Sequence, residues 1–299
     1  MFPTIERGSQ VAVLAPAGPV TESTYNAGLQ ILASRYNIVK SFEPTRAKNA
    51  TLPYLAADDN TRLRDFNEAL KNPDVKAIFC ARGGFGSSRL LAQLNKRAFQ
   101  KNKIPLIGFS DITALHAWAT TLNVPTVHGP VVTQLSRLPE NEITALFELL
   151  EKHTLPKLTG LKCVFPGQAS GILFGGNLTM LAHLCGTPWM PAMAGKILLL
   201  EEVEEAPYRL DRMLTQLLLS RVLNQLAGVV LGTFLNCDAK QGFPPTFVRA
   251  ESVLRERFAP LGIPVVSGAP VGHGDHNVAL PLGIEAHLDA DGGTLIFRG

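Results

Sequence analysis

The feature that most constrains this fold is the regular alternation of short apolar runs with amphipathic segments in the first half of the chain. The runs expected to be strands include "VAVLAP" (11–16), "VKAIFCARGG" (75–84) and "IPLIGFSD" (104–111). Between the first two, Leu63, Phe66 and Leu70 recur at helical spacing behind a start rich in Asp and Asn. Repeated strand–helix units predict an α/β domain built on a largely parallel sheet.

A change of pattern predicts a second domain. At 299 residues the chain is long enough for two domains of about 150 residues each. The strand–helix alternation loosens in "LPKLTGLKCVFPGQASG" (155–171), a stretch rich in Pro and Gly. We therefore predict an N-terminal domain over 1–165 and a C-terminal domain over 166–299.

Composition narrows the class of protein. Hydrophobic residues make up 46% of the chain and charged residues 18%, which is typical of a globular protein. The net charge is only +3, with Lys and Arg scattered along the chain, so a nucleic-acid partner is not expected. No run approaches the roughly 18 apolar residues of a membrane span, and the N-terminus lacks a signal-peptide pattern. We expect a soluble, cytoplasmic protein.

The cysteines give no sign of a metal site or a disulfide framework. They lie far apart, at Cys80, Cys163, Cys185 and Cys237. A metal-binding C-x-x-C pair is absent from this spacing. We interpret the four residues as buried thiols in a reducing cytoplasm and predict no bound metal.

Polar residues with catalytic potential follow three of the apolar runs. Ser110 follows "IPLIGF", Glu201 and Glu202 follow "KILLL", and His273 follows "PVVSGAPVG". Ligands of α/β sheets bind at the carboxyl ends of the strands. A serine needs a base to take its proton, and a histidine base needs a carboxylate to orient it. One candidate for each of these roles is present.

Ser110 lies where a predicted strand turns sharply into a helical pattern. Such a corner would lift Oγ out of the sheet and aim the following backbone N–H groups at an oxyanion. The stretch is Gly108-Phe-Ser-Asp-Ile112, so the G-x-S-x-G motif fails at its last glycine. The alternative is that Ser110 or Asp111 caps the helix.

A glycine-rich turn, "ARGGFGS" (81–87), follows another predicted strand. Such a loop can hold a phosphate, but the spacings of the dinucleotide and nucleotide-triphosphate motifs are absent. Bare glycine amides can equally approach a reacting carbonyl, while Arg82 could bind a carboxylate with two hydrogen bonds. A tight turn with an exposed arginine is the simpler alternative.

The acidic and histidine-rich stretches contain more candidates than one site needs. Glu201 directly continues a buried run and would require a cationic partner, whereas Glu204 and Glu205 suit a solvated loop. His273 and His276 lie in "GHGDHN", which lacks the helical H-E-x-x-H pattern of a zinc site. His116 is expected to be a packed or surface residue of a helix.

Taken together, the chain resembles the LD-carboxypeptidase family of serine peptidases. This family comprises muramoyltetrapeptide carboxypeptidases and also self-immunity peptidases that act on microcin-type peptide nucleotides. The resembling stretches occur in order along nearly the whole chain: "VAVLAPAGPV", "YLAADDNTRLRDFNEAL", "ARGGFGSSRLL", "IGFSDITALHAW", "HGP", "GGNLTMLAHLCGTPWMP", "LLLEEVEEAPYRLDRML" and "GHGDHNVALPLG".

The resemblance implies roles for individual residues. The implied catalytic triad is Ser110, Glu201 and His273, the implied oxyanion hole is the backbone amides of Gly84 and Asp111, and the implied substrate-binding residues are Arg82 and Asn177. Glu202 occupies a position where the family more often has aspartate, which leaves adjacent acids as candidates for the triad. We favour Glu201, with Glu205 as the next choice.

The resemblance also implies a fold and an activity. The fold would be an N-terminal Rossmann-like α/β domain carrying the serine and a C-terminal β-rich α/β domain carrying the glutamate and histidine, with the active site in the cleft between them. The activity would be release of the terminal D-alanine from muropeptide tetrapeptides during cell-wall recycling, by a homodimer needing no cofactor.

Three other functions remain as alternatives. Within the family, the alternative is cleavage of a peptidyl-nucleotide antibiotic. Outside it, the loop at Gly83 and Gly84 could hold a small anion in a protein without catalytic activity. A dinucleotide-dependent oxidoreductase would need the glycine loop to bind a nicotinamide cofactor.

Overall fold

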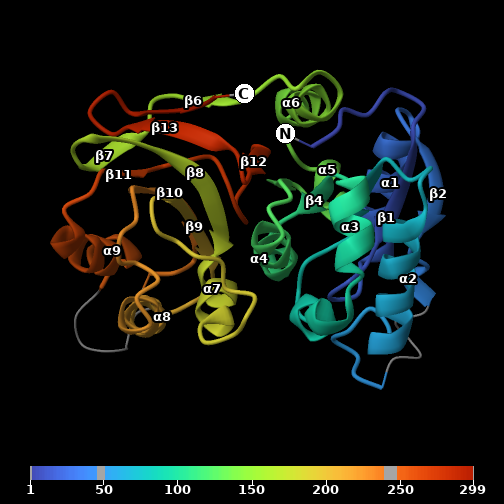
Figure 1. Cartoon of the computed structure of the whole chain (residues 1–299), viewed down its shortest axis with the longest axis horizontal. Helices are drawn as coiled ribbons and strands as arrows, with labels where there is room; N and C mark the ends of the chain where they lie inside the picture. Colours follow the sequence, from blue (N-terminus) through green and yellow to red (C-terminus); the bar gives the residue numbers. More distant parts are fainter. Residues whose placement is uncertain (1, 46–50, 239–247, 299) are drawn as a thin grey trace. The chain divides into compact units, whose positions relative to one another are not determined.

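The computed structural model describes residues 2–45, 51–238 and 248–298, which form two compact units (Figure 1). The first unit contains Met1–Thr154 and Asn277–Leu282, and the second contains Leu155–His276 and Gly283–Gly299. The division thus follows Thr154 rather than residue 165. The reason is that the turn-rich stretch after Leu155 forms edge strands of the second sheet.

The first unit is built on a six-stranded sheet with the order β12-β5-β4-β3-β1-β2. Its strands are β1 (Gln10–Leu14), β2 (Asn37–Ser41), β3 (Ala77–Cys80), β4 (Leu106–Gly108), β5 (Thr126–His128) and β12 (Leu280–Leu282). All neighbours are parallel except β12, which pairs antiparallel with β5. The prediction of a largely parallel sheet is confirmed.

Helices connect these strands. They are α1 (Glu22–Ala33), α2 (Asp59–Lys71), α3 (Lys96–Asn102), α4 (Thr113–Thr121), α5 (Val132–Leu135) and α6 (Glu140–Lys152), with 3₁₀ turns η2 (Ser87–Gln93) and η3 (Ser110–Ile112). Helix α1 packs against α5, and α2 packs against α3 and η2. Because parallel crossovers are right-handed and the strand order reverses after β2, these two groups cover opposite faces of the sheet.

The core of this unit follows from the apolar strands. Every residue of β3 is buried, as expected for a parallel strand covered on both faces. In α2, Phe66 and Leu70 are buried as predicted, and Asp58 caps the helix by accepting from Thr61 N–H at 2.9 Å. Leu63 is only half-buried, however, and Arg62 is the buried residue beside it.

The second unit is built on an eight-stranded mixed sheet with the order β6-β14-β13-β8-β9-β10-β11-β7. Its strands are β6 (Lys157–Leu158), β7 (Lys162–Phe165), β8 (Gln168–Asn177), β9 (Ile197–Val203), β10 (Gly228–Leu235), β11 (Val265–Ser267), β13 (Glu285–Asp289) and β14 (Thr294–Phe297). The strands from β8 to β11 run parallel, and the outer pairs are antiparallel.

Helices of this unit are α7 (Leu178–Leu184), α8 (Pro207–Leu219) and α9 (Ala250–Phe258), with the 3₁₀ turn η4 (Ala259–Leu261). Helix α8 packs against both α7 and α9. The predicted β-rich α/β character of the C-terminal half is confirmed. The prediction of buried cysteines is correct for Cys80 and Cys237, but Cys185 is half-buried, and Cys163 is exposed because it lies on the edge strand β7.

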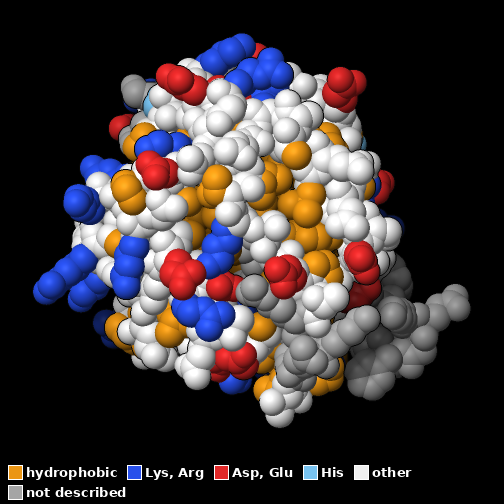
Figure 2. Space-filling model, turned by 90° about the vertical axis from the view of Figure 1, so that its right-hand side faces the viewer, with side chains coloured by type: hydrophobic (Ala, Val, Ile, Leu, Met, Phe, Trp, Pro, Cys, Tyr) orange, Lys and Arg blue, Asp and Glu red, His pale blue; other side chains and the backbone are white. Residues whose placement is uncertain are grey.

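Figure 2 shows the side of the first unit that carries β2 and α2, where hydrophobic side chains gather near the middle of the face and acidic and basic side chains lie mostly around them. Strand β2 ends the sheet, and its Lys40 pairs with Asp65 at 3.1 Å. A lysine on an edge strand discourages pairing with another sheet. Among the residues that the structure describes, no helix has the length and apolar character to cross a membrane.

Candidate active site

The candidate site of the first unit lies where the strand connections change direction. The chain leaves β1 toward β2 at one edge, then returns to β3 on the other side of β1. The connections that follow β1 and β3 therefore run toward opposite edges of the sheet, and open α/β sheets bind ligands at such a switch point. The two loops contact each other there, because Gly18 N–H donates to Gly83 O at 2.9 Å.

Ser110 begins η3 directly after β4, at the predicted strand-to-helix corner. Its φ of 64° is in the left-handed region, which residues with a side chain rarely adopt. The preceding Phe109 is extended, so the chain turns abruptly at the serine. The N-cap of α4 is Ile112, so neither Ser110 nor Asp111 occupies the N-cap position that the alternative interpretation required.

The glycine loop after β3 touches this corner. A Cβ built on Gly83 would lie 2.8 Å from Ser110 Cβ and 2.9 Å from its Oγ. The exposed Gly84 has a φ of 102° and passes close to the Gly18 backbone. Because Gly83 has no side chain, the loop can lie directly against Ser110.

Gly83→Ala tests this contact. The added methyl group would overlap Ser110, so either the serine or the loop must move. Because a small misplacement at a reacting centre can cost about 100-fold in rate, we expect kcat to fall by roughly that factor. Steady-state kinetics beside a thermal melt would measure both effects. Wild-type kcat in the folded variant would contradict the tight contact.

Asp111 is tied to the far end of the glycine loop. Its Oδ2 accepts from Ser87 N–H at 2.8 Å, and Ser87 Oγ–H donates to Asp111 O at 2.7 Å. Burial raises the pKa of the Asp111 carboxyl, which its hydrogen bonds to Ser87 partly oppose. Sequence reasoning missed Ser87, although it ends the glycine stretch that was singled out.

His116 supports β4 from beneath the corner. It is fully buried in α4, and its Nε2 lies 2.8 Å from Gly108 O, which also accepts from Gly129 N–H at 3.0 Å. The expected helix position is confirmed, and of the two alternatives, packed or surface, the residue is packed. Burial lowers the pKa of His116 to about 4, so the ring is neutral at pH 7 and donates Nε2–H to the carbonyl.

This histidine predicts a pH dependence of stability. The unfolded chain binds a proton at His116 below about pH 6.5, while the folded protein does so only near its pKa of about 4. Stability from this group is therefore complete above pH 6.5 and falls as the pH drops toward 4. The loss amounts to about 3 kcal/mol. Urea unfolding of the wild type and His116→Gln across this range measures it, and parallel curves for the two proteins would contradict the prediction.

The second unit holds a glutamate–histidine pair. Glu201 lies on β9 with its side chain fully buried, and its Oε2 is 2.6 Å from Nδ1 of His273. The side chain of His273 is 19% exposed. A carboxylate at Nδ1 orients the ring, stabilises its cation, and leaves Nε2 as the nitrogen that can exchange a proton.

The two other candidate acids have different partners. Glu202 Oε2 accepts from Thr179 N–H and Oε1 from Asn177 Nδ2, each at 2.8 Å, and burial raises the pKa of this carboxyl. Glu205 pairs with Arg209 at 3.3 Å. Of the three acids, the contacts of the described residues join only Glu201 to His273.

Gly272 was missed by sequence reasoning, and it makes the pair possible. Its φ is 121°, and a Cβ there would lie 2.8 Å from Glu201 Oε2. Only glycine combines this backbone conformation with room for the carboxylate. Its position directly before His273 was the available signal.

The predicted substrate-binding residues differ in their surroundings. Arg82 is exposed and donates to Pro19 O at 2.7 Å, which leaves further guanidinium N–H groups for a ligand. Asn177 is buried, caps α7 by accepting from Met180 N–H at 3.2 Å, and donates to Glu202. Its side chain thus supports the α7 terminus, and substrate contact by Asn177 stays a prediction.

Among the described residues, no group of three or more His, Cys, Asp or Glu side chains is arranged to hold a metal ion. His276, the other histidine of its loop, is exposed. The first unit therefore brings together Ser110, Asp111 and Gly83, the residue before Gly84, and the second brings together Glu201 and His273.

Both halves of the chain match known domains. Residues 11–129 match the LD-carboxypeptidase N-terminal domain, and residues 170–288 match the LD-carboxypeptidase C-terminal domain. The chain belongs to the LD-carboxypeptidase family. Members of this family are serine carboxypeptidases, and the resemblance noted in the sequence is confirmed.

Individual relatives of this LD-carboxypeptidase cover nearly the whole chain. A putative carboxypeptidase from Synechocystis is 39% identical over 98% of this chain and 95% of its own length. The murein tetrapeptide carboxypeptidase of Pseudomonas aeruginosa is 35% identical over 94% of each. The crystal structure of muramoyltetrapeptide carboxypeptidase from Oxalobacter formigenes has a TM-score of 0.84 and 32% identity, covering 97% of this chain and 99% of that one. The microcin C7 self-immunity protein MccF of Escherichia coli is more distant, at 28% identity over 93% of this chain and 88% of its own.

Proposed function

We propose that this LD-carboxypeptidase releases the terminal D-alanine from muropeptide tetrapeptides, with Ser110 as nucleophile. The observation that carries the proposal is the left-handed Ser110 held against the bare glycine loop. Hydrolases that use a serine nucleophile present it at such a strained strand-to-helix turn beside backbone amide donors, which supports the proposal. The murein tetrapeptide activity named for the Pseudomonas relative supports the choice of substrate.

In the proposed reaction, Ser110 Oγ attacks the carbonyl carbon of the bond to D-alanine while His273 Nε2 takes the hydroxyl proton. Glu201 holds Nδ1 and stabilises the cation that forms. The N–H groups of Gly84 and Asp111 receive the negative oxygen. His273 then gives its proton to the departing amine, and water hydrolyses the acyl-enzyme by the same steps.

The C-terminal carboxylate of the substrate needs a cation. We propose that Arg82 fills this role, because it is exposed and follows β3 at the start of the glycine loop. A guanidinium can bind a carboxylate with two parallel hydrogen bonds. This recognition would confine cleavage to the last residue of the peptide.

Mass spectrometry of purified muramyl tetrapeptide, incubated with the wild-type protein, tests the substrate. The expected result is loss of one alanine, with no change in a sample lacking protein. A peptidyl-nucleotide conjugate is tested in parallel, because the immunity protein MccF is a relative. An intact tetrapeptide together with a cleaved conjugate would overturn the proposal in favour of that reaction.

We further propose that the protein acts in the cytoplasm as a homodimer, as the family resemblance implies. Cytoplasmic muropeptides would then be its substrates. Light scattering coupled to size-exclusion chromatography would give twice the mass of the 32.3 kDa chain; a mass of one chain would contradict the dimer.

A further inference from the structure

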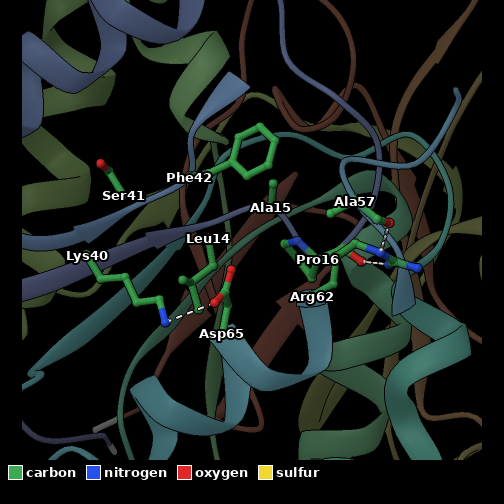
Figure 3. Close-up of a pocket in the computed structure, with 9 residues that line it drawn as sticks. All are labelled: Leu14, Ala15, Pro16, Lys40, Ser41, Phe42, Ala57, Arg62 and Asp65. Carbon is green, nitrogen blue, oxygen red and sulfur yellow. Dashed lines mark hydrogen bonds and ion pairs between the residues drawn. The ribbon is translucent and has the colours of Figure 1, made fainter. Parts of the chain in front are cut away.

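Arg62 is a buried cation that the reaction as described does not use. It lies in the first turn of α2, and its side chain is only 1% exposed. Nε donates to Ala57 O at 3.1 Å, and Nη1 donates to Gly86 O at 2.9 Å and to Pro16 O. Nη2 pairs with Asp59. Figure 3 shows the guanidinium between Ala57 and Pro16.

The three carbonyl groups that Arg62 binds come from three separate segments of the first unit: the loop after β1, the segment before α2, and the glycine loop after β3. Burying a charge is costly unless its hydrogen bonds are made. The planar, five-donor fork of arginine can bind several carbonyls at once, which the ammonium of lysine cannot reproduce. Arg62 therefore joins these loops in one arrangement.

The cavity beside Arg62 is too small for a substrate. The cavity that Figure 3 shows beside it, lined also by Leu14 and Phe42, has a volume of about 10 Å³. This is the space of roughly one water molecule. An effect of Arg62 on the reaction would thus act through the loops that it binds.

The glycine loop is held at both of its ends. Gly18 N–H binds Gly83 O, and Arg62 binds Gly86 O. The next residue, Ser87, gives its N–H to the Asp111 carboxylate. A Cβ on Gly86, whose φ is 128°, would lie 2.9 Å from Arg62 Nη1, so the loop also packs directly on the guanidinium. Gly84 lies between these two held ends.

Resting on the proposed function, we propose that Arg62 is a positioning residue for peptide hydrolysis. By binding Gly86 O, it holds the loop so that Gly84 N–H lies in place to receive the oxyanion beside Ser110. Loss of one oxyanion donor lowers kcat by about 100-fold or more, and displacing a donor should have a smaller effect of the same kind. Substrate affinity should change little, because the oxyanion exists only in the transition state.

Arg62→Lys tests the inference, with Arg89→Lys as the matched control. Arg89 also pairs with Asp59, at 2.6 Å, but it is exposed, and none of its side-chain bonds among the described residues reaches the glycine loop. Two rates are measured at a temperature at which circular dichroism shows each protein folded. These are tetrapeptide turnover and labelling of Ser110 by a fluorophosphonate. For Arg62→Lys we expect kcat and the labelling rate to fall roughly 10-fold with KM within about 2-fold, and for Arg89→Lys no change.

A folded Arg62→Lys protein with wild-type kcat and labelling would overturn the inference. If Arg62 variants do not fold, Asp59→Asn replaces them, because it removes the carboxylate partner and leaves the carbonyl bonds. It should lower labelling to a smaller extent and speed hydrogen exchange at the amides of 84–87; wild-type values for both would again overturn the inference. A wild-type protein that is labelled but leaves the tetrapeptide intact would refute the substrate alone, and the labelling ratios would still decide the role of Arg62.

Discussion

Ser110→Ala is expected to lower kcat for D-alanine release by a factor on the order of 10⁶, the loss typical of removing a serine nucleophile. Without Oγ, no acyl-enzyme can form, and the remaining amide donors can assist only direct attack by water. The residue is half-buried at a corner with a φ of 64°, where alanine and serine carry the same backbone strain. The variant should therefore fold with a melting temperature close to that of the wild type.

The measurement is single-turnover mass spectrometry at high protein concentration, beside circular dichroism. Ser88→Ala is the matched control, since it removes a half-buried hydroxyl from the same unit. Cleavage by Ser110→Ala at the wild-type rate would show that another group attacks the peptide. The proposed triad would then be wrong from its first member.

Glu201→Gln is expected to lower kcat by about 10⁴-fold, as happens when a triad carboxylate becomes an amide. The amide could still contact His273 Nδ1, but it would not stabilise the imidazolium and could hold the wrong tautomer. Because the carboxylate is completely buried, no solvent water could stabilise the imidazolium in its place. Both the value of kcat and its dependence on pH should therefore change.

Glu202→Gln is the matched control, one residue away on the same strand. Glu202 contacts Asn177 and two backbone N–H groups rather than a histidine. In this variant an amide nitrogen would face one of these N–H groups, which should lower the free energy of unfolding by about 1–3 kcal/mol. We expect kcat to stay near the wild-type value. The reverse pattern, inactive Glu202→Gln beside active Glu201→Gln, would exchange the roles of the two acids.

The adjacent acids Glu201 and Glu202 show what the alternation of side chains along a strand can and cannot predict. Successive side chains of a strand point to opposite faces, so Glu201 and Glu202 face different neighbours. Both are buried, and local pattern gives no reason to prefer one. The choice depends on which face of β9 meets the loop carrying His273, which is 72 residues away in the chain.

The domain boundary is a second feature that local sequence alone did not predict correctly. Local composition correctly marks 155–171 as turn-rich, but β6 and β7 form within it by pairing with β14 and β11. Those partners lie a hundred or more residues later. Strand pairing over such a separation leaves no trace in a local window, because short strands are stabilised mainly by their neighbours.

The sequence by itself determined the α/β class, the helical face of α2 at Phe66 and Leu70, and the sharp corner at Ser110. These depend on periodicity and on backbone preferences of neighbouring residues, which are local properties. Only the tertiary structure decided that Glu201 rather than Glu202 meets His273, that Gly83 must be bare against Ser110, and that Arg62 is buried among three carbonyls. Each of these depends on which distant segment fills the space around a side chain, and close packing settles that only when the whole unit has folded.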